Sequence, residues 1–293
     1  MRHYGSMNRF RDSIMIWKTR RQSFDAAKGG ILMGILNITP DSFSDGGSFV
    51  ALSKAVEHAL IMEREGASII DVGGESTRPG SDSVGEEEEK ERVIPVICEI
   101  RKSSDILISI DTRKPEVARA ALEAGADIVN DVGGAQAPGM AEVCAEYRCG
   151  IVVMHMKGEP KTMQENPAYH DVVDEVRSFF EERYQSLLKA GVEAEQICWD
   201  PGIGFGKSIK HNLALIAGLE KLRVAKRPLL LALSRKRMIG DLLGDAGAGR
   251  QPLGTAILTL CGHNHGAQIH RVHDVKECRM ALTLGMAVSA FDG

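Results

Sequence analysis

The chain has 293 residues, of which 43% are hydrophobic and 26% are charged, and its formal net charge is -4. This length accommodates one large α/β domain or two average ones, and so small a net charge gives no reason to expect a nucleic acid or a membrane as partner. The six cysteines form no CxxC pair, and no apolar run is long enough to span a bilayer, so we expect a cytoplasmic protein with reduced thiols.

The first 28 residues are basic, with seven Lys or Arg and two acidic residues. A basic segment poor in acids is typical of a transit peptide, which is one interpretation. The apolar run Ile14-Met-Ile-Trp17 favours a short strand instead. We therefore expect a frayed tail and a β-hairpin within residues 1–30, with the hairpin covering the bottom of a barrel.

Apolar strand-like runs then alternate with longer helical patterns, which indicates βα units and a parallel sheet. The expected strands are 31–36, 68–72, 107–110, 128–130, 150–154, 196–199, 229–233 and 268–271. The expected helices are 49–65, 86–102, 114–124, 139–147, 169–190, 210–222, 235–243, 252–264 and 274–287. Eight such repeats in this length predict a (β/α)8 TIM barrel, with a doubly wound open sheet as the alternative. No linker rich in Pro or Ser divides the chain, so residues 31–293 are expected to form one catalytic domain.

Polar residues recur where these strands end. In a TIM barrel the carboxyl ends of the strands build the active site, whereas the opposite rim serves stability. The residues at or just beyond the eight strand ends include Asn37, Asp71, Asp111, Asn130, Asp131, Met154, His155, Asp200, Ser234, Lys236, Arg271 and His273. Because these polar residues all lie at the same end of their strands, they predict a ligand-binding rim at that end of the barrel.

The residue types at this rim fall into two groups. Asp111, Asn130 and Asp200, with Lys236, offer the acceptors and donors that suit the edge of a planar heterocycle. Arg271 and His273, together with Arg78 and a cation bound by Asn37, suit a phosphate or pyrophosphate on the opposite side. An enzyme with both features would transfer a group from a pyrophosphate.

The motifs in which these residues lie resemble those of the dihydropteroate synthase family, the folate-pathway enzymes that sulfonamide drugs target. The resemblance spans about residues 14–288. It is carried by Asn37-Ile-Thr-Pro-Asp-Ser-Phe-Ser-Asp-Gly-Gly47, Gly73-Gly-Glu-Ser-Thr-Arg-Pro-Gly80, Ile110-Asp-Thr112, Asn130-Asp131, Met154-His-Met-Lys-Gly158, Asp200-Pro-Gly-Ile-Gly-Phe-Gly-Lys207, Ser234-Arg-Lys236 and Arg271-Val-His-Asp-Val275.

This resemblance implies that the chain joins 6-hydroxymethyl-7,8-dihydropterin pyrophosphate to p-aminobenzoate, giving 7,8-dihydropteroate and pyrophosphate. The pterin ring would be held by Asp111, Asn130, Asp200 and Lys236, with Met154 packed beside it. The pyrophosphate would be held by Arg271, His273 and Asn37, with Asn37 acting through Mg2+. Two loops carrying Asp41, Phe43, Thr77, Arg78 and Pro79 would close over the site and, with Phe205, shape the aminobenzoate pocket. The resemblance also implies a homodimer formed through the helices after the last two strands.

The chain departs from the family pattern at Arg237, where many members carry a Ser that helps to hold the aminobenzoate carboxylate. The Arg would bind the carboxylate itself, or it would point to solvent and leave this task to the helix N-terminus. Two other functions share the pterin floor. A methyltransferase using methyltetrahydrofolate would have no need of Arg271 and His273 or of the long first loop. A non-catalytic pterin-binding paralogue would be expected to lose Asn37, Lys236 or a mobile loop.

Overall fold

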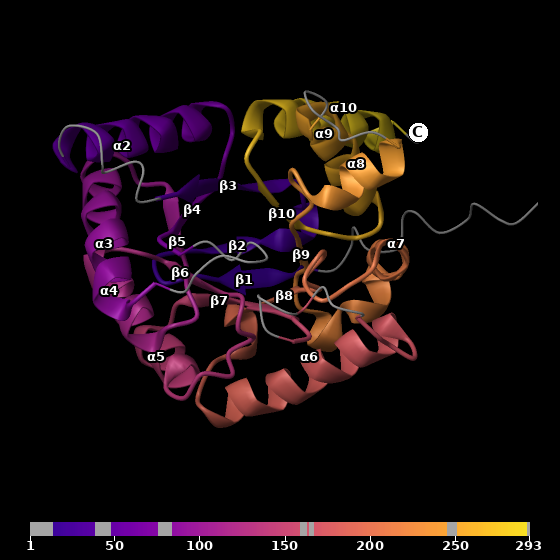
Figure 1. Cartoon of the computed structure of the whole chain (residues 1–293), viewed down its shortest axis with the longest axis horizontal. Helices are drawn as coiled ribbons and strands as arrows, with labels where there is room; N and C mark the ends of the chain where they lie inside the picture. Colours follow the sequence, from indigo (N-terminus) through magenta and orange to yellow (C-terminus); the bar gives the residue numbers. More distant parts are fainter. Residues whose placement is uncertain are drawn as a thin grey trace, which may run out of the picture.

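Eight parallel strands form a closed barrel with helices around it (Figure 1). The computed structural model describes residues 14–38, 48–75, 84–158, 163, 167–244 and 251–291. The barrel strands are β3 (Ile31–Asn37), β4 (Ile69–Gly73), β5 (Leu107–Asp111), β6 (Ile128–Asp131), β7 (Gly150–Met154), β8 (Ile197–Asp200), β9 (Leu230–Leu231) and β10 (Ile269–Val272).

Closure of the barrel decides between the two predicted architectures. The sheet runs in the order β8-β7-β6-β5-β4-β3-β10-β9, and a parallel bridge between Trp199 and Leu229 brings its two ends together. The main-chain N–H of Trp199 also donates to Pro228 O at 2.9 Å. The (β/α)8 prediction is therefore confirmed, and the open doubly wound sheet is wrong.

The helices follow the strands as expected. They are α2 (Ser48–Arg64), α3 (Glu86–Ser103), α4 (Pro115–Ala124), α5 (Met140–Tyr147), α6 (Val172–Lys189), α7 (Ile209–Ala217), α8 (Arg237–Leu243), α9 (Gln251–Asn264) and α10 (Val275–Ala290). The predicted helix 210–222 is divided at Gly218, after which Leu219–Leu222 form a 3-10 turn. No helix in the described ranges is both long enough and apolar enough to cross a bilayer.

The predicted strand 229–233 is shorter in the structure, where β9 has only two residues. This strand pairs with β10 through only two residues, Leu230 and Leu231. Leu229 O already accepts the main-chain N–H groups of Gln268 and Ile269, at 3.0 and 3.1 Å. Beyond Leu231 the chain turns toward the rim and leaves the ladder.

The N-terminal hairpin covers one end of the barrel, as predicted. Its strands β1 (Ile16–Lys18) and β2 (Ser23–Asp25) are antiparallel. Trp17 is fully buried, and its Nε1 donates to Gln196 O at 2.9 Å. The indole packs in an inner cluster with one residue from each barrel strand, namely Met33, Ile69, Leu107, Ile128, Val152, Cys198, Leu230 and Ile269. The hairpin thus closes the end opposite the polar rim.

Candidate active site

The inner cluster fixes which residues of the rim point inward. Successive side chains of a strand alternate between the two faces of the sheet, so residues two or four positions beyond the inner cluster also face the barrel interior. Counting in this way from the inner cluster gives Asn37, Asp71, Asp111, Asn130, Met154, Asp200 and Arg271. The sequence therefore brings two amides, three carboxylates and a guanidinium to one end of the barrel from strands far apart in the chain.

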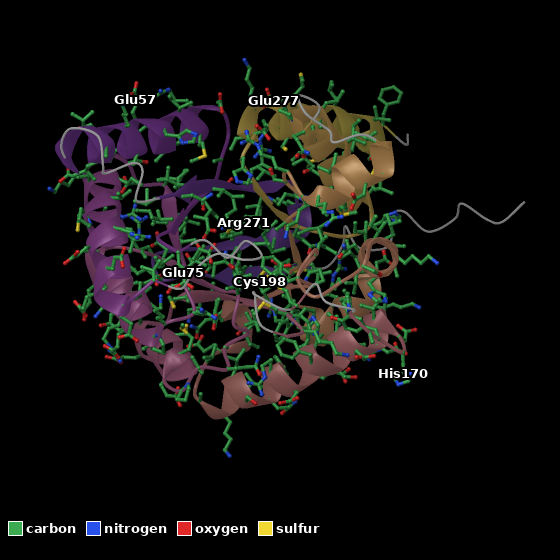
Figure 2. The ribbon with its side chains drawn as sticks, viewed as in Figure 1. Glu57, Glu75, His170, Cys198, Arg271 and Glu277 are labelled. Carbon is green, nitrogen blue, oxygen red and sulfur yellow. The ribbon has the colours of Figure 1, made fainter. Side chains whose placement is uncertain are left out.

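Arg271 lies at the centre of this polar layer. Its Nε donates to Asp71 Oδ2 at 2.6 Å, and its terminal Nη2 donates to Asp111 Oδ2 at 2.5 Å. Asn130 Nδ2 donates to the same Asp71 oxygen at 3.1 Å. In Figure 2 the label of Arg271 lies inside the ring of helices, whereas those of Glu57 and Glu277 lie at the periphery. The predicted separation of Arg271 from Asp111 on opposite sides of the site is wrong, because the two side chains are in contact.

Burial dominates the electrostatics of these groups. It raises the pKa of Asp111 to about 7, against the attraction of Arg271 and with added repulsion from Asp71. Burial also acts to lower the pKa of Arg271, but attraction to Asp71 and Asp111 outweighs it and raises the pKa above its usual range. The guanidinium is therefore permanently charged, while Asp111 titrates near neutral pH. The second oxygen of each carboxylate, Asp71 Oδ1 and Asp111 Oδ1, accepts no hydrogen bond from the described part of the chain.

Asp200 and Lys236 lie beside the turn that follows β8. Asp200 Oδ1 accepts the N–H of Gly202 at 2.7 Å, and burial raises the pKa of this carboxyl. Lys236 Nζ donates to Ile203 O at 2.5 Å and lies 4.2 Å from the ring centroid of Phe205. Burial lowers the pKa of Lys236 to about 8, with Asp200 opposing the shift. With a pKa of about 8, this amine keeps its proton near neutral pH and can donate hydrogen bonds.

The predicted pyrophosphate side is only partly described. His273 Nδ1 lies 3.0 Å from Ser234 Oγ, and its main-chain N–H donates to the same oxygen at 3.1 Å. Asn37 is exposed at the end of β3. A β-carbon at Gly73 would lie 3.7 Å from Asn37 Oδ1 and 3.4 Å from Asp111 Cβ, so these two side chains flank the same glycine. Asp41, Phe43, Thr77, Arg78 and Pro79 lie outside the described residues.

Two further predicted residues lie at the end of the barrel. Met154 is 2% exposed at the end of β7, and Phe205 is half-buried in the turn after β8. The side chain of Arg237 is 92% exposed and lies 3.5 Å from Asp241 in the same helix. Of the two alternatives for Arg237, the structure thus favours a side chain that points to solvent.

Sequence reasoning gave no specific role to Asp71 or to Lys207. Asp71 supports both Arg271 and Asn130, and the alternation along β4 was the signal that could have assigned it. Lys207 is 3% exposed and donates to Phe205 O at 2.9 Å. No periodic pattern marks Lys207, because it follows a glycine-rich turn rather than a strand.

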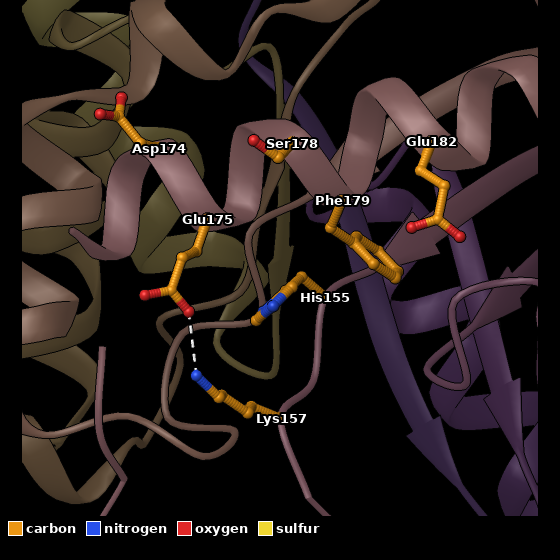
Figure 3. A pocket seen from close by; sticks show the side chains of 7 residues that line it. All are labelled: His155, Lys157, Asp174, Glu175, Ser178, Phe179 and Glu182. Atoms are coloured by element: carbon orange, nitrogen blue, oxygen red, sulfur yellow. Dashed lines mark hydrogen bonds and ion pairs between the residues drawn. The ribbon is translucent and has the colours of Figure 1, made fainter. Parts of the chain in front are cut away.

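A separate hollow of about 470 Å³ lies between the segment after β7 and α6 (Figure 3). Its lining residues are His155, Lys157, Asp174, Glu175, Ser178, Phe179 and Glu182. Lys157 and Glu175 form an ion pair of 2.9 Å across it. Of the residues predicted at the rim, only His155 lines this hollow, and Asp111, Asn130 and Asp200 do not.

Comparisons with known proteins agree with this geometry. The family model described as "Pterin binding enzyme" matches residues 33–273. A dihydropteroate synthase of Escherichia coli K12 is 48% identical over 246 residues, which are 84% of this chain and 87% of that one.

Two solved structures share the fold. A dihydropteroate synthase of Yersinia pestis in a sulfonamide drug complex superposes with a TM-score of 0.87 at 40% identity, covering 94% of this chain and 100% of that one. One of Xanthomonas albilineans with 4-aminobenzoic acid gives a TM-score of 0.87 at 41% identity, covering 95% and 99%. The chain therefore belongs to the pterin-binding enzyme family and, within it, to the dihydropteroate synthases.

Proposed function

We propose that the polar layer at the carboxyl ends of the strands is where this chain performs the dihydropteroate synthase reaction of folate biosynthesis. The reaction condenses 6-hydroxymethyl-7,8-dihydropterin pyrophosphate with p-aminobenzoate and releases pyrophosphate. The observation that carries this assignment is the convergence of Asp111, Asn130, Asp200 and Lys236 at one end of a closed barrel. Membership of the dihydropteroate synthases supports the same conclusion.

The pterin would lie on this layer. The ring edge of a pterin carries both N–H donors and oxygen or nitrogen acceptors, so it needs a mixed set of partners. Asp111 and Asp200 would accept its N–H groups, while Asn130 and Lys236 would donate to its acceptors. Met154, which is apolar and buried at the end of β7, would pack beside the ring.

Pyrophosphate would be held at the edge of this layer by Arg271 and His273. The guanidinium of Arg271 has a fixed fork of donors that matches phosphate oxygens as well as carboxylates. Its contacts with Asp71 and Asp111 keep it charged and oriented before substrate binds. We infer that Arg271 serves both as a counter-ion of Asp111 and as a pyrophosphate ligand.

We propose Mg2+ as the cofactor, with Asn37 as its protein ligand. The exposed carboxamide oxygen of Asn37 fits an ion that prefers oxygen ligands and that keeps several waters and substrate phosphates. Bound there, the ion would offset negative charge on the departing pyrophosphate.

The rim residues then account for the chemistry. Loss of pyrophosphate leaves a positive charge on the methylene carbon of the pterin. The carboxylate of Asp111 stabilises this charge, which is an electrostatic contribution from a group already in place. The neutral amine of p-aminobenzoate forms the new carbon–nitrogen bond and afterwards releases one proton. Phe205, which lies against Lys236, would form one wall of the aminobenzoate site, where a sulfonamide would compete.

We also propose that two copies of the chain associate through α9 and α10. Exposed apolar side chains gather on these neighbouring helices, including Leu253, Ile257, Met280, Leu284 and Val288. Sedimentation of the chain and of a Leu284→Glu variant would test this, with a monomeric unchanged chain as the contradicting result. A cytoplasmic location stays a prediction, which the six free thiols support.

The experiment that tests the function is pyrophosphate release from the dihydropterin pyrophosphate, with and without p-aminobenzoate, in Mg2+ and in EDTA. We expect Mg2+-dependent release that yields dihydropteroate and that is lost in Lys236→Ala. Lys157→Ala is the matched control, because this lysine pairs with Glu175 outside the polar layer. Tight pterin binding without turnover would identify a non-catalytic pterin-binding protein, and no pterin binding would refute the assignment.

A further inference from the structure

Lys207 is a buried cation that the reaction described above does not use. Its side chain is almost fully enclosed behind the turn that follows β8. Nζ lies 2.9 Å from Phe205 O, 3.0 Å from His155 Nδ1 and 3.2 Å from His155 O. An ammonium group has three N–H donors, so these three acceptors satisfy it completely.

All three partners of Lys207 are neutral. Burial lowers the pKa of His155 to about 3, so its ring is uncharged and Nδ1 can accept a hydrogen bond. Among the described residues no carboxylate touches the ammonium. Burial lowers the pKa of Lys207 to about 7, although Asp200 attracts the ammonium from a distance. A buried ammonium without a contacting anion is stabilised only while every donor is occupied. Movement of Phe205 O or His155 O away from Nζ is therefore costly.

The turn held by Lys207 fits closely against the segment after β7. Gly202 and Gly206 have φ values of +67° and +62°, and a β-carbon at either one would collide with a main-chain oxygen, of His155 or of Lys157 respectively. Tyr169 adds a further contact, because its hydroxyl donates to Gly206 O at 3.0 Å. The turn thus packs directly against the segment that follows β7.

The position of the turn also determines the surroundings of Lys236. The turn supplies both described partners of the Lys236 ammonium, namely Ile203 O at 2.5 Å and the ring of Phe205 at 4.2 Å. We propose that Lys207 is a positioning residue of the condensation: by binding Phe205 O and both acceptors of His155, it holds the turn that presents Phe205 to Lys236 and to p-aminobenzoate. This inference rests on the proposed function.

If Lys207 positions the turn, its loss should affect the binding of p-aminobenzoate more than the binding of the pterin. Asp111 and Asn130 come from β5 and β6, and their side-chain hydrogen bonds are with Arg271 and Asp71 rather than with the turn. Asp200 and Lys236 do touch the turn, through Gly202 and Ile203, so pterin binding should weaken on the loss of Lys207 but less than aminobenzoate binding. The aminobenzoate side depends on Phe205, so it should suffer more.

The test is Lys207→Met, with Lys157→Met as the control for the same substitution in the neighbouring segment, where the lysine faces Glu175 (Figure 3). We expect the KM for p-aminobenzoate to rise about tenfold in Lys207→Met, as displacement of a binding group by a fraction of an ångström would produce. The Kd of dihydropterin pyrophosphate, measured calorimetrically without p-aminobenzoate, should change by less than about threefold.

Kinetic constants equal to those of Lys157→Met would overturn the proposal, and so would equal losses for both substrates. If Lys207→Met does not fold, His155→Leu replaces it, since this change removes the ring acceptor and keeps the carbonyl. His155→Leu should raise the same KM about threefold, and an unaltered KM would contradict the proposal. Failure of the proposed function is separate, because the unchanged chain would then form no dihydropteroate.

Discussion

Asp111→Asn should make the chain more stable at alkaline pH while it removes activity. The carboxylate is 5% exposed and contacts Arg271 at 2.5 Å, yet one of its oxygens accepts no hydrogen bond from the described residues. Ionised Asp111 is therefore poorly compensated. Asparagine has nearly the same shape and never ionises, so the substitution removes the cost of the buried charge.

The magnitude follows from the pKa of this group. Burial is the largest influence and raises the pKa of Asp111 from 3.8 to about 7. A carboxyl with a higher pKa in the folded chain binds more protons when folded, so its contribution to the unfolding free energy decreases as the pH rises. The penalty is absent below pH 3.8 and complete above about pH 7. Between about pH 5 and about pH 8 it amounts to about 2.5 kcal/mol.

The assay is denaturant unfolding of the unchanged chain and of Asp111→Asn at these two pH values. We expect the difference in unfolding free energy to move by about 2.5 kcal/mol in favour of the variant at the higher pH. Asp105→Asn is the control, because the Asp105 side chain is fully exposed. The activity of Asp111→Asn should fall at least about 100-fold, through loss of the charge that stabilises the methylene cation. A stability difference that is the same at both pH values would refute the argument.

Three further substitutions test other parts of the site. Arg271→Met leaves Asp71 and Asp111 without their cation, so the unfolding free energy should fall by about 3–5 kcal/mol near pH 8 and by less near pH 5. The measurement is denaturant unfolding, and equal losses at the two pH values would count against this reasoning. Gly202→Ala should lower the unfolding free energy by at least about 2 kcal/mol, because the new β-carbon meets His155 O. The control is Gly139→Ala, where the nearest atom is 3.7 Å from the new β-carbon, and it should lower the unfolding free energy by about 1 kcal/mol in the same assay. Arg237→Ser should leave the KM for p-aminobenzoate within about threefold, since the side chain is 92% exposed, and a larger rise would show that the guanidinium binds the carboxylate.

Most of the fold could be predicted from local patterns. Apolar runs separated by amphipathic segments predicted eight strands and the helices between them, because side-chain periodicity is a property of neighbouring residues. The predicted strand ends placed Asp111, Asn130 and Asp200 at the rim, where they lie in the structure. The ends of β9 and of α7 were less predictable, since they depend on pairing with β10 and on the break at Gly218.

Only the tertiary structure decided which of these side chains meet. Asp71 and Asp111 are 200 and 160 residues away from Arg271 in the chain, and all three come together because the barrel closes. The distance between strands around a closed barrel depends on their order and stagger, which no local pattern contains. The burial that raises the pKa of Asp111 and lowers that of Lys207 has the same origin. The sequence by itself determined the kinds of groups at the rim, whereas their contacts and protonation follow from closure of the barrel, because both depend on residues that are distant in the chain.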